Sequence, residues 1–479
     1  MNLQPDACYR AARARDRRFD GQFFVAITTT GIYCRPICPA RPAKRAHMRF
    51  FPHAAAAERA GFRPCLRCRP ERAPGIAPVD SVSRLIEAAM AGIEEHALSS
   101  ARVGDLAAAL GVSDRHLRRV TETALGVSPI ELAQTQRLLL AKRLLKETAL
   151  SQTEIAFASG FGSVRRFNAL FKSRYGLSPR ALRGAMSSRP DGIKVQLEYR
   201  PPFAWERMLS YLALRAIPGV EMIDATHYRR TVSIGSAEGV IAVGAACRDD
   251  CIELEITPAL APHVGSIIAR VKRLLDLGAV PDAVSRHLGQ DPLLANTVRR
   301  LPGLRVAGAF DGFELAVRTV LGQQVSVKSA STLAGRWAAS FGKPIATAYP
   351  ALDRLSPSAE TVAQLTEDQL AALGMVGARA RCLIALARAI LDKRVVLTLA
   401  TDVEAQIENL RSVPGIGPWT AHYIAMRALH WPDAFPSGDL MLMRAANSSR
   451  RQLETRAEAW RPWRAYAAHY LWQSLGVAP

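Results

Sequence analysis

The chain has 479 residues, which is enough for three or four domains of ordinary size. Its 63 Lys and Arg outnumber its 42 Asp and Glu, and the net charge of +21 favours a polyanion as partner, either nucleic acid or an anionic membrane. A general arginine bias is the alternative explanation of this charge. No apolar stretch reaches the roughly 18 residues of a membrane-spanning helix, and no signal peptide is recognisable. These features exclude a membrane protein and predict a cytosolic protein associated with the nucleoid.

Residues 1–75 are rich in arginine and in turns, and residues 23–27 are predicted to form a strand. In a chain without an export signal, clustered cysteines are typical of metal ligands rather than of disulfides. A C-x₃-C and a C-x₂-C pair together can complete a tetrahedral zinc site. The four cysteines spaced in this way are Cys34, Cys38, Cys65 and Cys68. Taken alone, this pattern favours a purely structural zinc site.

The cysteines lie in two short sequences, TTGIYCRP and GFRPCLRC. Over about 70 residues the segment resembles the N-terminal domain of the Ada-type methylation sensors. The resemblance implies that Cys34 is a zinc ligand and also accepts, in a single turnover, a methyl group from DNA methylphosphotriesters. Methylation would remove one negative charge from the cluster, so its affinity for DNA phosphates should rise. Arg35, Arg41 and Arg67 flank the cluster and are expected to contact phosphates, with ordinary solvated charge as the alternative.

After a linker at 73–78, residues 80–187 are predicted to be all-helical, within a domain at 76–187, with an internal repeat offset by 50 residues. Each copy has a small-residue helix, a glycine turn and an arginine-rich second helix, which indicates two helix-turn-helix units. The second helices, at 113–121 and 163–171, would enter successive major grooves. The block resembles the AraC-type DNA-binding domain, and a helical linker bundle is the alternative. The residues expected on the exposed sides of these helices are Asp114, Arg115, Arg118, Val164, Arg165 and Asn168.

A break at 187–192 precedes the next domain, 190–303. The Ada family would continue here with a methyltransferase domain that carries a Pro-Cys-His-Arg motif, but the sequence lacks this motif, so direct repair of methylguanine is not expected. Strands at 194–199, 231–234, 240–243 and 251–256 and helices at 205–214 and 263–277 predict an α+β domain with an antiparallel sheet. It resembles the N-terminal domain of AlkA-type glycosylases and is expected to brace the catalytic domain. Cys247 and Cys251 are interpreted as ordinary thiols.

Residues 304–479 are predicted to be helical, with helices at 313–323, 328–341, 367–373, 378–392 and 403–410. A tight glycine hairpin at 413–417 feeds a helix that begins at Pro418, and such a hairpin can offer bare N–H groups to a DNA phosphate. Gly415 and Gly417 are therefore expected DNA contacts, with a plain linker between helices as the alternative. Asp439 opens a further helix, and by itself it would be an N-cap.

The hairpin and the aspartate together resemble the helix-hairpin-helix DNA glycosylases, and the AlkA-type family most of all. The resemblance implies that Asp439 is the catalytic carboxylate, which would stabilise the oxocarbenium-like sugar and activate water. Trp419, Tyr423 and Trp472 would form the pocket for a flipped base, although such aromatics are usually core. A cationic alkylated base would gain about 0.5–2 kcal/mol from these rings. Gln324 stands where the AlkA pattern has a wedge leucine, and it would contact DNA.

The sequence thus predicts a multidomain, mainly α chain. Its predicted parts are a zinc-bound α/β domain (1–75), an all-α double helix-turn-helix domain (76–187), an α+β antiparallel-sheet domain (190–303) and an all-α helix-hairpin-helix domain (304–479). Where bifunctional lyase relatives keep a lysine, this chain has His422 and Tyr423, so we expect a monofunctional glycosylase that leaves an abasic site. The expected ligands are one zinc ion and a monovalent cation at the hairpin carbonyls.

The predicted function is DNA alkylation repair combined with regulation of the adaptive response. The expected partners are damaged and promoter double-stranded DNA and RNA polymerase, and the chain is expected to be a monomer. One alternative is a transcription regulator whose glycosylase half is degenerate. Another is a glycosylase that the other modules only bring to DNA, with a structural zinc.

Overall fold

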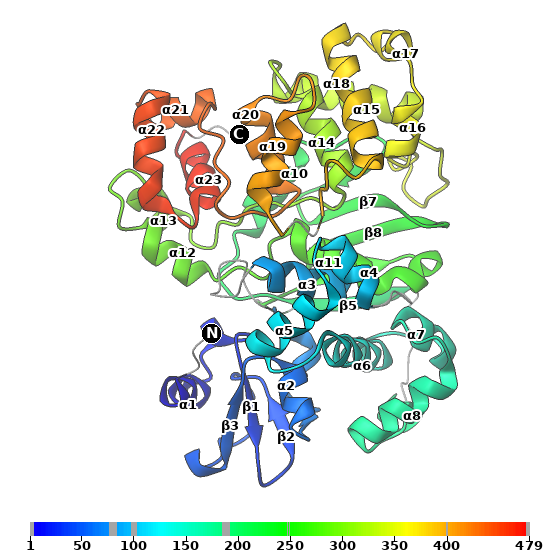
Figure 1. Ribbon diagram of the computed structural model, residues 1–479, viewed down its shortest axis with the longest axis vertical. Coiled ribbons are helices and arrows are strands. Elements are labelled where there is room, and N and C mark those ends of the chain that lie inside the picture. The colour runs from blue at the N-terminus through cyan, green and yellow to red at the C-terminus, as the bar shows by residue number, and fades with distance from the viewer. Residues whose placement is uncertain are drawn as a thin grey trace. The chain divides into compact units, whose positions relative to one another are not determined.

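The computed structural model describes residues 4–75, 84–96, 103–183, 192–246, 248, 250–398 and 401–475. The chain forms two compact units, and Figure 1 labels most of their helices and strands. The first unit comprises residues 1–201, 246–272 and 277–279, and the second comprises 202–245, 273–276 and 280–479. The linkers predicted at 73–78 and 187–192 lie largely outside the described residues, as does Cys247.

The first unit begins with a four-stranded sheet in the order β3-β1-β2-β4. Strand β1 is antiparallel to both of its neighbours, and β2 pairs with β4 in parallel, which places the ends of these two strands side by side. The buried side chains of Phe24, Tyr33 and Phe62 form the core under helix α2. The strand predicted at 23–27 is confirmed as β1. The elements of this part are α1 (Pro5–Ala14), β1 (Phe24–Ile27), β2 (Ile32–Cys34), β3 (Met48–Phe51), α2 (Ala54–Arg59) and β4 (Arg63–Pro64).

A helical block follows, and its geometry repeats as the sequence predicts. Helices α5 and α8 begin after Ser113 and Ser163, whose hydroxyls accept the N–H groups three residues further on. Both helices end at glycines in the left-handed region, Gly126 at φ +74° and Gly176 at φ +71°. The two helix-turn-helix pairs are therefore α4–α5 and α7–α8. The helices are α3 (Arg84–His96), α4 (Val103–Ala109), α5 (Asp114–Leu125), α6 (Pro129–Glu147), α7 (Gln152–Ala158), α8 (Val164–Tyr175) and α9 (Pro179–Arg183).

The predicted strands and helices of the α+β region are present, but their residues are divided between the two units. In the first unit β5 (Ile193–Glu198) pairs antiparallel with β9 (Cys251–Ile256), and residues 264–272 of α11 (Val264–Leu274) follow. In the second unit β6 (Glu221–Ile223), β7 (His227–Ile234) and β8 (Ala237–Ala245) form an antiparallel run.

The rest of the second unit is helical and surrounds one large apolar core. The helices predicted between 313 and 410 are confirmed as α14, α15, α17, α18 and α19, with ends that differ by one or two residues. The helices of this unit are α10 (Trp205–Ala213), α12 (Pro281–Leu288), α13 (Ala295–Arg300), α14 (Gly312–Leu321), α15 (Val327–Phe341), α16 (Ala359–Ala363), α17 (Glu367–Ala371), α18 (Gly377–Leu391), α19 (Val403–Arg411), α20 (Pro418–Arg427), α21 (Leu440–Ala446), α22 (Arg450–Ala457) and α23 (Arg464–Ser474).

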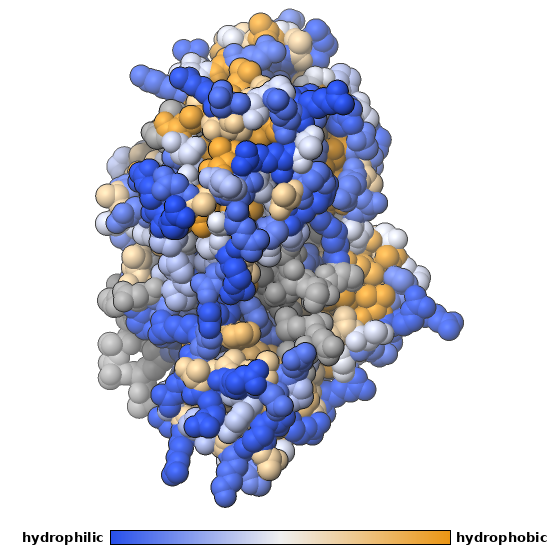
Figure 2. Space-filling model, turned by 90° about the vertical axis from the view of Figure 1, so that its left-hand side faces the viewer, coloured by the Kyte–Doolittle hydropathy of each residue, from blue (hydrophilic) through white to orange (hydrophobic). Residues whose placement is uncertain are grey.

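The hydropathy of the surface and of the described helices bears on the requirements of a membrane span. Figure 2 shows hydrophilic residues over most of the face that it draws, with the hydrophobic residues in separate groups. None of the described helices combines the length and the apolar character needed to span a bilayer.

Candidate functional site

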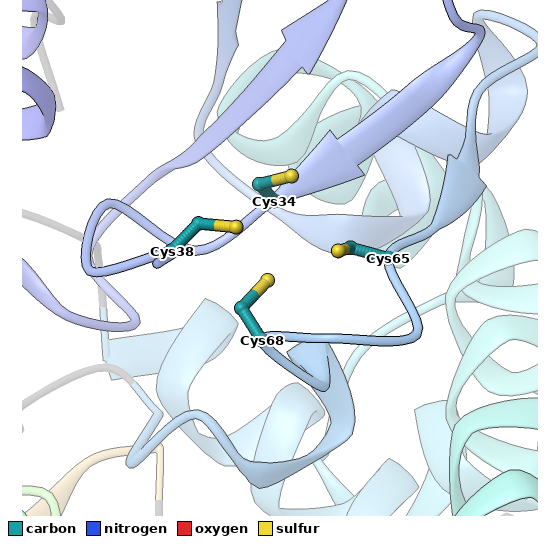
Figure 3. Close-up of side chains that lie close together, drawn as sticks. All are labelled: Cys34, Cys38, Cys65 and Cys68. Atoms are coloured by element: carbon teal, nitrogen blue, oxygen red, sulfur yellow. The ribbon is translucent and has the colours of Figure 1, made fainter. Parts of the chain in front are cut away.

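The first candidate site is the cysteine cluster of the first unit. Cys34 ends strand β2 and Cys65 directly follows β4, so the parallel pairing of these strands brings the two cysteine pairs together. The four sulfur atoms all lie within 4.8 Å of one another and point toward a common centre, as Figure 3 shows. In a tetrahedral site with Zn–S bonds of about 2.3 Å, the sulfur atoms lie slightly less than about 4 Å from one another. The spacing of the four sulfurs in this cluster therefore fits a zinc ion.

The environments of the four sulfurs differ. Cys65 and Cys68 are buried, whereas Cys34 and Cys38 are half-buried. The backbone N–H of Arg35 donates to Cys68 Sγ at 3.3 Å, and another backbone N–H donates to Cys65 Sγ. Hydrogen bonds among the sulfurs raise the pKa of Cys34 and lower the pKa of Cys65, because the thiols compete for the same protons. A divalent cation would remove this competition by stabilising all four thiolates.

The prediction that Arg35 contacts a DNA phosphate is wrong. Its side chain is only 3% exposed, and its guanidinium is ion-paired with Asp20 and with Glu198. Burial disfavours the charged form, but Asp20 and Glu198 outweigh this effect and raise the pKa of Arg35. A guanidinium held by two buried carboxylates is not available to a ligand. Arg41 and Arg67 are exposed, and their contact with DNA phosphates stays a prediction.

The residues predicted on the DNA sides of α5 and α8 all retain exposed surface. Arg118 forms an ion pair with Asp114 at 3.3 Å, and an exposed pair of this kind is easily exchanged for a phosphate. The side-chain oxygen of Asn168 accepts a hydrogen bond from Gln152. The exposed members of the set are Arg115, Arg118 and Arg165, and the half-buried ones are Asp114, Val164 and Asn168.

The second candidate site is a cavity of about 300 Å³ in the second unit, at the lower end of the size range of small-molecule pockets. Trp419 and Tyr423 lie one turn apart on α20, and their rings stack with centroids 5.3 Å apart. The ring centroid of Trp472, on α23, lies 6.3 Å from that of Tyr423. The structure thus brings the three predicted aromatic residues together with Asp439 around one cavity.

Asp439 is the N-cap of α21, as predicted, and its carboxylate also lines the cavity. Its Oδ1 accepts the backbone N–H groups of Met441 and Leu442 at 2.9 and 3.0 Å. The indole N–H of Trp419 donates to Oδ2 at 2.8 Å, and that of Trp472 donates to Oδ1 at 3.2 Å. Four N–H donors therefore fix the orientation of one carboxylate against the aromatic wall.

The two glycines of the hairpin differ in backbone conformation and in the space around them. Gly415 has φ +91°, and a Cβ at this position would lie 3.0 Å from Cys382 Cβ. Gly417 has an ordinary φ of −85°, and a Cβ there would meet nothing within 4 Å. The hairpin is also tied to the preceding loop, because the side-chain amide of Gln323 donates to Gly415 O at 2.9 Å. Pro418 occupies the first turn of α20, as predicted.

Gln324 follows in the same loop and is exposed. Its φ of +55° is unusual for a residue other than glycine, and such backbone conformations cluster at functional sites. Its neighbour Val325 is 41% exposed and lines the cavity. The loop therefore presents one polar and one apolar side chain beside the pocket.

Sequence reasoning missed the polar end of this cavity. Arg427 Nη1 donates to the hydroxyls of Tyr211 and Tyr423, both at 3.0 Å, and these hydroxyls lie 2.8 Å from each other. The guanidinium of Arg215 lies 4.0 Å from the centre of the Tyr211 ring. Burial raises the pKa of Tyr211 to about 12. Burial also acts to raise the pKa of Tyr423, but Arg427 and Arg215 outweigh it and lower that pKa to about 7. No local sequence signal indicates that Tyr211, Tyr423 and Arg427 would meet, because Tyr211 lies 212 residues from Tyr423.

Four family models match the chain in series. They are the metal binding domain of Ada at residues 7–71, a helix-turn-helix domain at 106–185, the AlkA N-terminal domain at 194–311, and the HhH-GPD superfamily of base excision DNA repair proteins at 317–464. The first, third and fourth of these correspond to the Ada-type and AlkA-type resemblances seen in the sequence, and the second confirms the predicted helix-turn-helix domain.

Individual proteins extend these matches over the whole chain. A probable bifunctional transcriptional activator/DNA repair enzyme AlkA of Mycobacterium tuberculosis is 39% identical over 98% of this chain and 96% of its own length. DNA-3-methyladenine glycosylase 2 of Escherichia coli is 34% identical over 59% of this chain and 98% of its own. The structure of a 3-methyladenine DNA-glycosylase from Archaeoglobus fulgidus matches with a TM-score of 0.50 and 20% identity, over 58% of this chain and 96% of that one, which shows a shared fold.

Proposed function

We propose that this chain, which belongs to the family of bifunctional transcriptional activators and DNA repair enzymes of the AlkA type, excises alkylated bases and reports methylated DNA phosphates. The family joins a regulator to a DNA glycosylase, and DNA is the partner of both halves. We assign the zinc domain to 1–75, the helix-turn-helix domain to 76–187, the α+β domain to 190–303 and the glycosylase domain to 304–479. RNA polymerase is a further partner in this proposal.

The observation that carries the glycosylase proposal is the carboxylate of Asp439 against the wall of three aromatic rings. A base inside a duplex is out of reach, so the damaged nucleotide must turn out of the stack and enter the cavity. Stacked aromatic rings attract a cationic alkylated base, which is already a good leaving group. Asp439 then stabilises the positive charge that develops on the sugar and orients or deprotonates the attacking water.

The residues around the cavity favour a monofunctional enzyme. Among the described residues that line it there is no lysine, which a lyase would need to form a Schiff base. His422 is half-buried, and burial lowers the pKa of its imidazole. The convergence of Trp419, Tyr423 and Asp439 also disfavours the alternative of a degenerate glycosylase half.

Two loops beside the cavity are proposed to hold the duplex. Gly417 leaves open space where a side chain would stand, so a phosphate can approach the N-terminus of α20 closely. Gly415 O already accepts a hydrogen bond from Gln323, and the other hairpin carbonyls would hold a monovalent cation in the same contact. Gln324 would fill the gap left by the flipped nucleotide, with less apolar stacking than a leucine gives.

In the first unit, Cys34 is proposed as the methyl acceptor on a zinc ion held by all four cysteines. Two observations support it over its neighbours. Cys34 is half-buried, whereas Cys65 and Cys68 are buried. Within the described ranges, the backbone N–H groups that bond cysteine sulfurs reach Cys38, Cys65 and Cys68. A thiolate without such donors keeps its electron pair more available for attack.

The experiment that tests the glycosylase proposal measures base release from methylated duplex DNA. Asp439→Asn removes the negative charge but keeps a side-chain oxygen that can cap α21. Asp402→Asn is the matched control, because Asp402 caps α19 by accepting the N–H of Ala405 at 2.9 Å. We expect release to disappear in Asp439→Asn and to persist in Asp402→Asn. Full release by folded Asp439→Asn protein would reject the mechanism, and no release by the wild type would favour the regulator alone.

A further inference from the structure

We infer that Tyr211 is a positioning residue that sets the charge at the polar end of the base pocket, and thereby the preference between cationic and uncharged damaged bases. This inference rests on the proposed glycosylase function. Tyr211 lies on α10, in the part of the chain that the sequence predicts to be only a brace.

The geometry at this end of the pocket is a closed triangle of polar atoms. The Tyr211 and Tyr423 hydroxyls lie 2.8 Å apart, and Arg427 Nη1 donates to both at 3.0 Å. Tyr211 itself is 4% exposed and does not line the cavity, so it reaches a bound base only through Tyr423. With Arg427 as donor to both oxygens, one hydroxyl proton must lie between the two tyrosines.

A buried guanidinium beside the pocket poses an electrostatic problem for a cationic base. Arg427 is 4% exposed, and its hydrogen bonds go to the two phenol oxygens and to the carbonyl of Gly308. A like charge in a desolvated pocket repels the base. Ionisation of one phenol would cancel the guanidinium charge and remove this repulsion. Tyr211, as hydrogen-bond donor, would then stabilise the Tyr423 phenolate.

The groups around Tyr423 favour this ionisation. Its pKa is lowered to about 7, because the charges of Arg427 and Arg215 outweigh burial, whereas the pKa of Tyr211 is raised to about 12 by burial. Tyr423 is therefore the member that loses its proton near neutral pH, and Tyr211 keeps its own. The charged or titratable groups that line the pocket or act on Tyr423 are Arg427 of α20, Tyr211 of α10, Arg215 two residues beyond α10, Glu221 of β6, Arg230 of β7, Asp311 at the start of α14, Glu314 and Arg318 of α14, Asp439 at the start of α21 and His469 of α23.

The charges of Arg427 and Tyr423 determine how release of a cationic base depends on pH. Below about pH 7 the pocket carries the uncompensated Arg427 charge, and above it the phenolate compensates that charge. Release of a cationic base should therefore rise as the pH increases through about 7, whereas release of an uncharged base should not. A hydrogen bond donated to a charged group lowers the pKa of the acceptor by about 1–2 pH units. Loss of the Tyr211 hydroxyl should therefore move the increase in release of the cationic base to a pH higher by that amount.

The test compares full-length wild type with Tyr211→Phe, and uses Tyr470→Phe as control. Tyr470 is also buried, but its hydroxyl donates to the carbonyl of Leu301 at 3.5 Å and has no hydrogen bond to Tyr423 or Arg427 among the described residues. Single-turnover base release is measured across about pH 6 to 9 on duplexes that carry one N7-methylguanine, which is cationic, or one hypoxanthine, which is uncharged. We expect Tyr211→Phe to lower release of the cationic base about tenfold relative to the uncharged one near neutral pH. Tyr470→Phe should leave the ratio unchanged.

An ultraviolet titration of ionising tyrosines separates this inference from the proposed function. The wild type should show one tyrosine that titrates near pH 7, absent in Tyr423→Phe and shifted upward in Tyr211→Phe. If this titration is seen but neither base is released, the glycosylase proposal fails and the charge assignment stands. If no tyrosine titrates in this range, or Tyr211→Phe slows both bases equally with an unmoved pH profile, the inference is overturned.

Discussion

The hairpin allows two matched substitutions, because positions 415 and 417 favour glycine for different physical reasons. In Gly415→Ala the new Cβ would sit in a left-handed conformation at φ +91° and 3.0 Å from Cys382 Cβ, in the buried interface with α18. The left-handed conformation alone costs about 1–2 kcal/mol, and the close contact adds to it. We expect about 2–3 kcal/mol of destabilisation, or roughly 4–12 °C in the unfolding midpoint of a unit of this size.

Gly417→Ala should behave in the opposite way. Its φ of −85° suits alanine and its Cβ meets nothing within 4 Å, which favours a gain in stability through the unfolded chain. Gly417 is also the N-cap of α20, a position where alanine is unfavourable, so the net change should stay within about 1 kcal/mol. Its affinity for duplex DNA should nevertheless fall, because the added methyl group occupies the space proposed for a phosphate. Thermal unfolding and DNA binding at two salt concentrations measure the two effects. A Gly415→Ala protein as stable as the wild type, or a Gly417→Ala protein with unchanged DNA affinity, would refute this reasoning.

Three further predictions concern the other assigned residues. Cys34→Ala should abolish methyl uptake from phosphotriester DNA, and uptake by a variant that still contains zinc by metal analysis would reject the acceptor role. Gln324→Leu should raise base release from duplex DNA several-fold without changing the thermal midpoint, because an apolar side chain fills the gap in the stack more favourably; equal rates would argue against the wedge position. Arg35→Met should destabilise the first unit by about 3–5 kcal/mol in denaturant unfolding, because it removes the buried guanidinium that pairs with the carboxylates of Asp20 and Glu198. Glu198 keeps its ion pairs with Arg72 and Arg248, so the loss falls mainly on Asp20. A loss below about 1 kcal/mol would contradict that account.

Local signals in the sequence were sufficient for many of the elements, whereas the pocket residues were assigned from the resemblance to the AlkA-type glycosylases. The repeat could be predicted because its helices begin at Ser113 and Ser163 and end at glycines, and caps act over three or four residues. Trp419 and Tyr423 are one helical turn apart, so their shared face follows from helix geometry. The N-cap role of Asp439 is equally local.

The features that could not be predicted depend on partners far away in the chain. Arg35 looks like a surface arginine until Glu198, 163 residues later, is placed beside it. Tyr211 and Tyr423 are 212 residues apart, and nothing in either neighbourhood indicates that their hydroxyls meet. A buried ion pair or a shared proton is a property of the assembled fold, and its two halves carry no common pattern in sequence.

The position of Asp439 shows why a helix cap suits a catalytic carboxylate. A charge that must act on a developing cation has to be held in place before the reaction, since reorientation during the reaction would cost free energy. The backbone N–H groups at the start of α21 hold Oδ1 with no side-chain entropy of their own, and Trp419 directs Oδ2 toward the aromatic wall. The indole groups that would stack on the base thus also aim the carboxylate. A substitution of either indole should therefore disturb both base binding and catalysis, and the two effects cannot be treated as additive.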